Sequence, residues 1–280
     1  MRIGAVSYLN TKPLVFGLQA IAPQHELVFD LPSRLADQLA EGRLDVALIP
    51  SVESFGTADY SVISDACIAC RGPVMSVKLL SRVQPVSIRT LALDEGSRTS
   101  AALVQILLRE RFGISPEIVA FPIGSAADDV PADALLMIGD RAMHSGLSGP
   151  KNGSSGKYVA EWDLGDIWCR WAELPFVFAM WVAGPGGNDA ARRNELAELA
   201  AILSNARDEG VAHLPEIAER EHAAVGLSYE QCLTYLRDHL YFFLGPRERA
   251  GLELFYDHVS RLGLAPSRPR AELFNPISVS

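Results

Sequence analysis

The sequence has few cysteines and lacks the paired motifs that hold a structural metal. Four cysteines occur in 280 residues, and Cys67 and Cys70 form the single CxxC motif. Zinc sites usually combine two such pairs, or one pair with two spaced histidines, and neither combination follows here. The motif lies in an apolar run rather than at a helix start, where a thiolate would be stabilised. We therefore expect buried, reduced thiols and no metal site.

Basic residues are also scarce. The 25 lysines and arginines are outnumbered by 34 acidic residues, which gives a net charge of −9. Proteins that bind a phosphate backbone need the opposite balance or a concentrated basic face. The adjacent pair Arg192-Arg193 lies in a helical pattern beside Glu195 and Glu198, as is typical of a solvated helix face. Nucleic acids and anionic membrane surfaces are not expected as partners.

Long hydrophobic runs are missing as well. No stretch approaches the roughly 18 uninterrupted apolar residues that a membrane-spanning helix needs. Residues 1–6 carry one basic side chain and continue directly into a strand-like pattern, without the apolar segment and cleavage site of a signal peptide. These features predict a cytoplasmic protein that does not enter a membrane.

Several catalytic motifs are absent. The sequence contains no glycine-rich nucleotide fingerprint, P-loop, HExxH or G-x-S-x-G motif. Its six histidines are scattered along the chain: His25, His144, His213, His222, His239 and His258. A histidine base is therefore unsupported. We expect any chemistry to use neutral hydrogen-bonding groups, backbone amides or the substrate itself.

What the sequence does contain is ample core material, with 49% apolar residues arranged in alternating strand-like and helix-like segments. Such alternation predicts an α/β fold. The expected strands cover 2–7, 46–49, 60–69, 74–81, 90–93, 117–121, 134–138 and 174–183. The expected helices follow Asn10-Thr11 and cover 33–42, 101–112, 189–209, 214–221, 228–239 and 246–262, so that everything after 184–187 is helical. Residues 145–156 form a polar, glycine-rich loop that we expect to be mobile.

Two long apolar strands, at 74–81 and 176–183, bracket the middle of the chain. If they lie side by side, residues 84–174 form a lobe inserted into a larger lobe made of residues 1–83 and 175–280. Two connections between lobes make a hinge, and ligand sites commonly lie at such interfaces. The predicted fold is a two-lobed, type II periplasmic-binding-protein-like α/β structure with an interlobe cleft.

The clearest local motif is at residues 93–100, where a strand ends, Gly96 permits a tight turn and Ser97, Thr99 and Ser100 open a helix. Free backbone N–H groups at a helix start, together with the helix dipole, form a seat for an anion. The alternative is that these hydroxyls only cap the helix, and capping and anion binding are compatible. The sequence leaves both open.

Other polar residues follow expected strands. Asn10 comes after the first strand in a second helix-start motif, although an asparagine there is more often only a cap. Ser76 lies early on a strand expected to pass through the hinge. Ser51 and the pair Gly139-Asp140 follow strand ends, where side chains reach the cleft of an open α/β sheet. Asp140 has the alternative of pairing with its neighbouring arginine or capping a helix.

Several blocks together resemble the MqnA family, the chorismate dehydratases of the futalosine route to menaquinone. They are Val6-Ser7-Tyr8-Leu9-Asn10-Thr11-Lys12-Pro13-Leu14, Asp45-Val46-Ala47-Leu48-Ile49-Pro50-Ser51, Gly72-Pro73-Val74-Met75-Ser76-Val77, Ser97-Arg98-Thr99-Ser100, Ile138-Gly139-Asp140, Asp163-Leu164-Gly165 and Leu174-Pro175-Phe176-Val177-Phe178-Ala179-Met180-Trp181. The blocks span residues 6–181 in the family's order, whereas the C-terminal helices match only in general character.

The resemblance implies conversion of chorismate to 3-[(1-carboxyvinyl)oxy]benzoate with loss of water, without a cofactor. In the family, the residues tied to turnover correspond to Asn10 and Ser76. Substrate-binding candidates are Ser51, Ser97, Arg98, Thr99, Ser100, Gly139 and Asp140. The substrate's own carboxylate is the expected proton acceptor, with Asp140 as the protein alternative. We expect a monomer or homodimer whose partner is this small dicarboxylate.

Two other functions are consistent with the same fold, because function depends on the site. One is a binding protein that holds a small carboxylate without transforming it. The other is the dihydroxynaphthoate-forming synthase of the same pathway, although the blocks at 7–14 and 97–100 favour the dehydratase.

Overall fold

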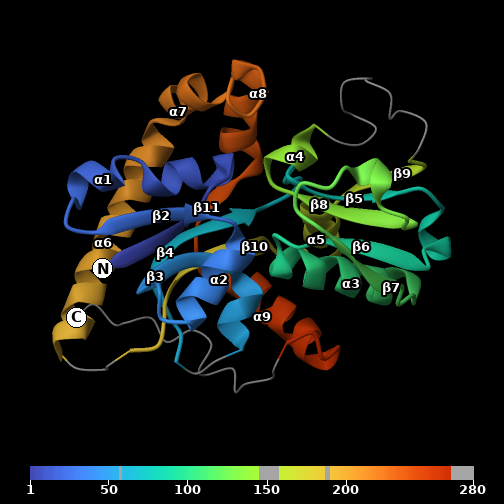
Figure 1. The fold of residues 1–280 in the computed structure, drawn as a ribbon, viewed down its shortest axis with the longest axis horizontal. Helices are drawn as coiled ribbons and strands as arrows, with labels where there is room; N and C mark the ends of the chain where they lie inside the picture. Colours follow the sequence, from blue (N-terminus) through green and yellow to red (C-terminus); the bar gives the residue numbers. More distant parts are fainter. Residues whose placement is uncertain (57–58, 145–157, 187–189, 266–280) are drawn as a thin grey trace.

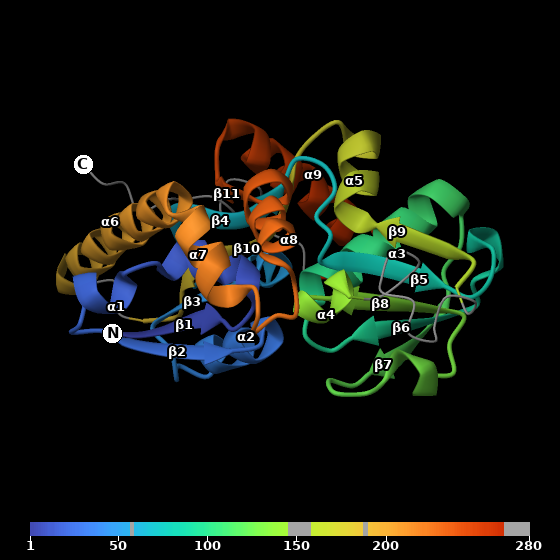
Figure 2. The same ribbon diagram turned by 90° about the horizontal axis from the view of Figure 1, so that it is seen from above.

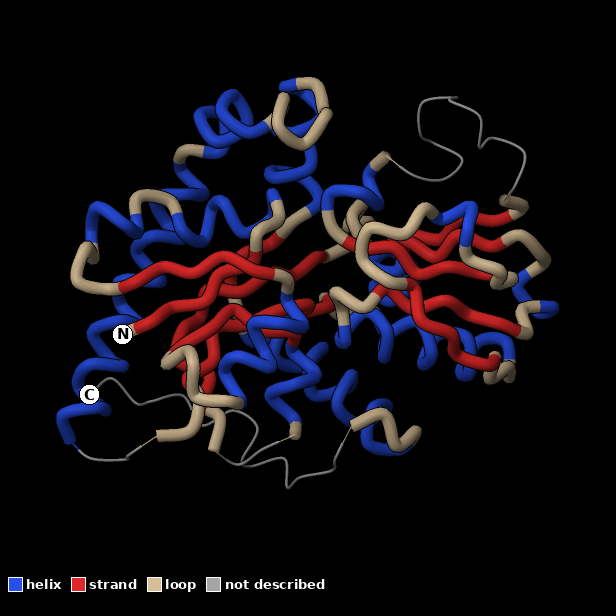
Figure 3. Tube along the Cα trace, viewed as in Figure 1, coloured by secondary structure: helices blue, strands red, loops and turns tan. Residues whose placement is uncertain are grey.

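The computed structural model describes residues 1–56, 59–144, 158–186 and 190–265. These residues form two lobes side by side, each built around one sheet with helices packed on it (Figures 1 and 3). The predicted two-lobed α/β architecture is confirmed. The glycine-rich segment 145–156 lies outside the described residues, so its predicted mobility is not addressed.

The first lobe contains a mixed six-stranded sheet. In spatial order its strands are β11 (Tyr241–Phe243), β4 (Ser61–Cys70), β10 (Phe176–Ala183), β3 (Val46–Pro50), β1 (Arg2–Val6) and β2 (Glu26–Asp30). Strand β1 runs parallel to β2 and β3, whereas β10 runs antiparallel to β3 and β4. Every residue of β3 and β10 is buried, as expected of central strands covered on both faces.

Helices cover both faces of this first sheet. They are η1 (Leu9–Val15), α1 (Leu18–Ile21), α2 (Pro32–Ala40), η2 (Ser51–Phe55), α6 (Ala190–Ala212), α7 (Leu214–Glu221), α8 (Tyr229–Thr234), the π-helical turn η5 (Tyr235–His239) and α9 (Pro246–Arg261). Helix α6 packs on η1 and β4, α2 on β3 and β1, and α9 on β10. Among the described residues, none of the helices has both the length and the apolar character to cross a membrane.

The second lobe contains a five-stranded sheet. Its strands are, in order, β7 (Glu117–Phe121), β6 (Thr90–Asp94), β8 (Ala134–Ile138), β5 (Val77–Ser81) and β9 (Ala160–Asp163). Its helices are η3 (Pro85–Ser87), α3 (Arg98–Phe112), η4 (Ala127–Asp129), α4 (Asp140–Met143) and α5 (Leu164–Ala172). Helix α3 is capped at its C-terminal end by Gly113, whose φ of +67° is the left-handed conformation that favours glycine.

The expected pairing of the strands at 74–81 and 176–183 is wrong. Strand β5 pairs with β8 and β9 in the second sheet, and β4 is the strand that lies beside β10. Apolar patterning marks both β4 and β5 as buried strands but does not say which sheet each one joins. The chain thus first crosses between the sheets at residues 71–76. The predicted lobe boundary at 83/84 therefore moves to 71–76, and we propose lobes of residues 1–70 with 175–280 and of 77–174.

Some of the helices and strands differ locally from those expected from the sequence. The helix expected after Asn10-Thr11 is the 3₁₀ helix η1, which begins before these two residues, at Leu9, and has no side-chain cap. The segment after residue 187 is not wholly helical, because three residues form β11 at the edge of the first sheet. Strands β2 and β9 and helix α5 were not predicted, since β2 and β9 are half-buried edge strands without a strong apolar pattern.

Candidate functional site

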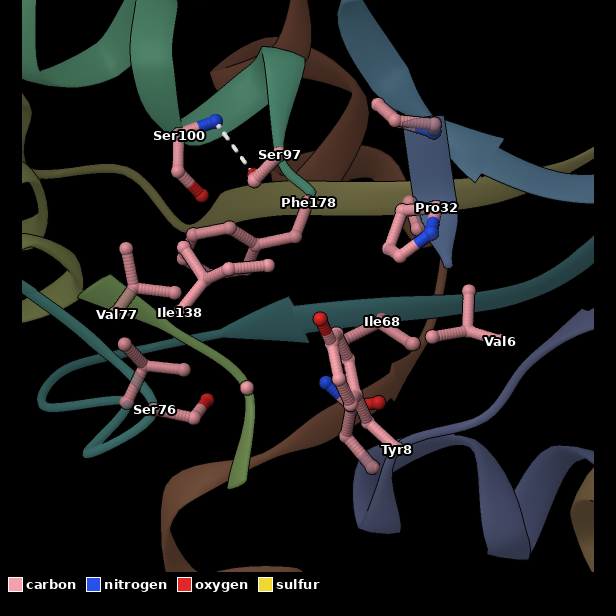
Figure 4. Close-up of a pocket in the computed structure, with 15 residues that line it drawn as sticks. Val6, Tyr8, Pro32, Ile68, Ser76, Val77, Ser97, Ser100, Ile138 and Phe178 are labelled. Atoms are coloured by element: carbon pink, nitrogen blue, oxygen red, sulfur yellow. Dashed lines mark hydrogen bonds between the residues drawn. The ribbon is translucent and has the colours of Figure 1, made fainter. Parts of the chain in front are cut away.

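A cavity lies between the two lobes, lined by residues of both sheets and of the segments that follow them. Ligand sites commonly lie at such interfaces. Its lining is mostly apolar, with a few hydroxyl and amide groups: Val6, Tyr8, Asn10, Pro32, Pro50, Ile68, Val74, Ser76, Val77, Ser97, Ser100, Ile138, Gly139, Phe178 and Ala179. In Figure 4, Ser97 and Ser100 lie across this space from Tyr8. Asn10, Ser76 and the 97–100 turn therefore share one hollow.

The first lobe contributes Tyr8 and Asn10 from the segment that joins β1 to η1. Because η1 begins at Leu9, Asn10 lies inside its first turn and its amide does not cap the helix. The Asn10 carbonyl oxygen accepts a hydrogen bond from Thr11 Oγ1 at 3.3 Å. This contact orients the amide, and its NH₂ group keeps two donors for other partners.

The second lobe contributes the start of helix α3. Ser97 is the N-cap residue, and its hydroxyl oxygen accepts from the Ser100 N–H at 3.2 Å. The helix extends over 15 residues, so the positive end of its dipole lies at the cavity. The hydroxyls of Ser97 and Ser100 lie beside this end (Figure 4). The same turn therefore caps the helix and offers donors to an anion, which are the two roles that the sequence left open.

Asp94, which is almost wholly buried, supports this turn from below. Its carboxylate accepts N–H groups from Gly96 at 3.0 Å and Ile138 at 3.2 Å. It also forms an ion pair with Arg141. The guanidinium of Arg141 stacks on the Phe121 ring, with its central carbon 4.5 Å from the ring centroid. Asp94 thereby fixes the 94–97 turn and the end of β8 relative to each other.

Ser76 projects from the 71–76 crossing, which holds an unusual backbone conformation. Met75 has a φ of +62°, a left-handed conformation that costs on the order of 1 kcal/mol for a residue with a side chain. Asp163 stabilises this conformation, since its carboxylate accepts N–H groups from Val74 at 3.0 Å and Met75 at 2.6 Å. The crossing is therefore held tightly where it presents Ser76 to the cavity.

Contacts between the lobes surround the cavity. The Tyr8 ring lies against Gly139, and the Leu9 N–H donates to the Asp140 carboxylate at 3.2 Å. Asp140 is partly buried, and burial raises its pKa, while the Leu9 N–H and Lys12 act in the opposite direction. Burial is also the main cause that raises the pKa of Tyr8 far above its usual value, so its hydroxyl stays protonated.

Four predicted binding residues lie outside the cavity lining. Ser51 is fully buried and donates to the Val177 carbonyl at 2.8 Å, and its oxygen lies 3.4 Å from Thr99 Oγ1. Thr99 Oγ1 accepts from the Val52 N–H, and Arg98 pairs with Asp37 and Glu53 across the lobes. Asp140 contacts the backbone of Leu9 instead of the cavity. We now propose that Ser51, Arg98, Thr99 and Asp140 hold the lobes together and do not contact a ligand.

The sequence patterns did not single out Tyr8, Phe178 or Tyr235. Tyr8 and Phe178 line the cavity, and both lie inside blocks noted for other residues. Tyr235 lies behind the lining, fully buried, and its hydroxyl donates to Ser76 Oγ at 2.9 Å. In the sequence, Tyr235 lies in a helical, apolar pattern, and such a pattern indicates a core residue.

The lining side chains are all uncharged. Groups of histidine, cysteine and acidic residues that could hold a metal are not found within the described part of the chain. Cys67 and Cys70 are buried free thiols, and burial raises the pKa of Cys67. This cavity can hold an anion through hydroxyl, amide and helix-end N–H donors, which act strongly in apolar surroundings.

Comparison with known proteins gives the following relatives. A family model described as menaquinone biosynthesis matches residues 1–261. A chorismate dehydratase from Thermus thermophilus is 29% identical over 287 aligned positions, which cover 95% of this chain and 99% of the relative.

Solved structures share the fold at low identity. A protein from Archaeoglobus fulgidus superposes with a TM-score of 0.68 at 16% identity, over 94% of this chain and 97% of that one. The alkanesulfonate-binding protein SsuA from Xanthomonas axonopodis, bound to MOPS, gives 0.67 at 14% identity over 95% and 94% of the chains. The periplasmic aliphatic sulphonate binding protein SsuA from Escherichia coli gives 0.65 at 15% identity over 100% and 93%. The chain thus has the periplasmic-binding-protein fold.

Proposed function

Because the chain belongs to the menaquinone biosynthesis family, we propose that it is a chorismate dehydratase, a hydro-lyase acting on a small dicarboxylate. Elimination of water from chorismate gives 3-[(1-carboxyvinyl)oxy]benzoate. The similarity to the Thermus enzyme along nearly its whole length supports this assignment. The cavity between the lobes supports it independently, since its neutral donors suit an anionic ring with apolar faces.

Each side of the cavity has a role in binding. The start of α3, with the hydroxyls of Ser97 and Ser100, grips one carboxylate through hydroxyl and N–H donors. The apolar side chains of Ile138 and Phe178 pack on the faces of the ring. Asn10 and Ser76 contact the enolpyruvyl group and stabilise negative charge that develops during elimination.

The elimination needs a base and a leaving group. The ring carbon that carries the enol ether loses its proton, and the electron pair of that C–H bond forms the new ring double bond. The neighbouring carbon loses its hydroxyl, which takes up a proton and leaves as water, and the ring becomes aromatic. Because no charged side chain lines the cavity, the proton acceptor is the substrate's own carboxylate.

The observation that carries the proposal is the shared hollow of Asn10, Ser76 and the start of α3. The test is to incubate purified protein with chorismate and follow the ultraviolet spectrum, with chromatography of the product. We expect the diene absorption to be replaced by that of the aromatic ring, with one product formed per chorismate consumed. Folded protein that leaves chorismate unchanged would reject the assignment.

The two alternatives are outcomes of the same experiment. A carboxylate-binding protein would bind chorismate in calorimetry and leave it intact. A dihydroxynaphthoate-forming synthase would neither bind nor convert it. No feature of the cavity favours either over the dehydratase.

A further inference from the structure

Tyr235 connects two parts of the candidate site that are far apart in the sequence. Its side chain is fully buried, and its hydroxyl donates to Ser76 Oγ, 159 positions earlier, at 2.9 Å. The nearby Asn10 side chain acts to lower the pKa of the same phenol. One phenol group from the C-terminal helices therefore contacts Ser76 and lies near Asn10, the two polar residues to which we assign the enolpyruvyl group.

The direction of the hydrogen bond to Ser76 follows from proton counting. A tyrosine hydroxyl has one proton, and that proton goes to Ser76. The Asn10 carbonyl oxygen accepts from Thr11, so the donors that Asn10 has left are those of its NH₂ group. A donor near the phenol oxygen favours the ionised phenol, which agrees with the lowering effect of Asn10 on the Tyr235 pKa. Tyr235, Ser76 and Asn10 thus form one polar cluster.

This arrangement leaves donor protons for a ligand on both lining residues. Ser76 accepts from Tyr235, so its own hydroxyl proton can point into the cavity that it lines. Asn10 keeps the protons of its NH₂ group. The hydrogen bond from Tyr235 polarises the Ser76 hydroxyl, which makes it a better donor toward developing negative charge.

The backbone around Tyr235 is built to hold it. Tyr235 begins the π-helical turn η5, and single π turns often occur at functional sites. At the other end of the same turn, the His239 ring nitrogen Nδ1 lies 2.9 Å from the Pro73 carbonyl oxygen. The turn thus contacts the 71–76 crossing at two points, on either side of the left-handed Met75. In Figure 2, α8, which leads into η5, lies over the junction between the lobes.

Tyr235 acts as a fixed donor and not as a base. Burial raises the pKa of this phenol far above its usual value, so it stays protonated near neutral pH. It lies behind the lining residues and does not reach the cavity itself.

We propose that Tyr235 is a positioning residue of the dehydration, which sets the hydroxyl of Ser76 and the amide of Asn10 in the orientation that the elimination needs. This inference rests on the proposed chorismate dehydratase function. The alternative is that Tyr235 is an ordinary core residue, which would affect stability but not turnover.

The test compares Tyr235→Phe with the wild type and with Tyr256→Phe, which removes the hydroxyl of another buried tyrosine, beside Phe55 in the first lobe. We expect Tyr235→Phe to lower kcat for chorismate by roughly ten- to a hundredfold with little change in KM. Tyr256→Phe is expected to keep the wild-type kcat. Circular dichroism and thermal unfolding establish that each variant is folded, and Tyr235→Met provides a second hydroxyl-free variant if the first does not fold.

A double-mutant cycle with Ser76→Ala separates positioning from a merely structural effect. If Tyr235 acts through Ser76, adding Tyr235→Phe to Ser76→Ala lowers kcat much less than it does in the wild type. Multiplicative losses, an unchanged kcat in Tyr235→Phe, or a change in KM alone would overturn the inference while leaving the dehydratase assignment intact. A folded wild type that does not convert chorismate would reject the assignment and this inference together.

Discussion

The aromatic ring of Tyr8 lies so close to Gly139 that a Cβ atom at position 139 would come within 2.8 Å of the ring carbon that bears the hydroxyl. Tyr8 follows β1 of the first lobe, and Gly139 follows β8 of the second. The phenol oxygen also lies near Gly96, at the turn that opens α3. The contact is therefore possible only because position 139 has no side chain, and it brings the lobes together at the edge of the cavity.

Replacing Gly139 by alanine should disturb this contact and weaken substrate turnover. The new methyl group would displace the Tyr8 ring, which lines the cavity, and we expect kcat/KM for chorismate to fall at least tenfold. Gly42→Ala is a control for alanine at a positive φ, because Gly42 has a φ of +69° but no atom within 4 Å of the added group. Gly139 combines its φ of +68° with a ψ of −158°, a conformation that residues other than glycine rarely adopt, so its backbone cost adds to that of the clash with Tyr8. Equal kcat/KM values in the two variants would show that the Tyr8 contact is unimportant.

The sequence indicated much of this site because its signals are local. A turn with Gly96 and three hydroxyl residues opens a helix whatever the rest of the chain does, and α3 begins there. Pairing between distant segments has no such signal. Nothing in the pattern of β5 distinguishes partnership with β8 from partnership with β10, and Tyr235 meets Ser76 across 159 positions. The same limit explains Arg98, whose motif suggested a ligand but whose partners are Asp37 and Glu53.

Asp163 is predicted to link stability of the 71–76 crossing to turnover. Asp163→Ala removes the acceptor for the N–H groups of Val74 and Met75, and should cost about 1–3 kcal/mol of unfolding free energy. Because Met75 then has less support for its left-handed conformation, Ser76 should shift, and kcat should fall at least tenfold. Urea unfolding and steady-state kinetics measure the two effects.

Asp133→Ala is the control for that variant. Asp133 also accepts two backbone N–H groups, from Arg89 at 2.8 Å and Thr90 at 3.1 Å, in the second lobe and outside the cavity lining. It should lose comparable stability and keep its kcat when assayed well below its unfolding temperature. A kcat for Asp163→Ala as high as that of Asp133→Ala would refute a special role for Asp163.

Replacing Gly210 by alanine should destabilise the protein, contrary to the usual effect of this substitution inside a helix. Glycine to alanine in a helix interior ordinarily stabilises by about 1 kcal/mol. In α6, however, a Cβ at position 210 would lie 2.0 Å from the Pro13 carbonyl oxygen of η1. We expect Gly210→Ala to lower the unfolding free energy by about 1–3 kcal/mol, measured by urea titration. Asn205→Ala, at an exposed position of the same helix, should change it little or raise it slightly. Any stabilisation by Gly210→Ala would mean that α6 and η1 are not packed this closely.

Asp140→Asn tests the source of the proton acceptor. Asp140 lies outside the cavity lining and contacts the Leu9 N–H, an interaction that an asparagine oxygen can replace. If the substrate's carboxylate accepts the proton, kcat for chorismate near neutral pH should stay within about threefold of the wild type, since a lost general base typically costs a hundredfold or more. A fall of that larger size in a folded variant would make Asp140 the base.

The same variant also tests the electrostatics of Asp140, because burial raises the pKa of its carboxyl in the folded protein above the ordinary value of 3.8. A carboxyl with a raised folded-state pKa holds its proton more tightly when folded. Its contribution to the unfolding free energy is therefore greatest below the unfolded-state pKa, and it is lost as pH rises through the folded-state pKa. Asparagine does not titrate, so the wild type should lose stability relative to Asp140→Asn as pH rises from about 3.8, and the difference should become constant above the folded-state pKa. Urea unfolding of both proteins across this pH range measures the difference, and parallel curves would show that burial does not shift the Asp140 pKa.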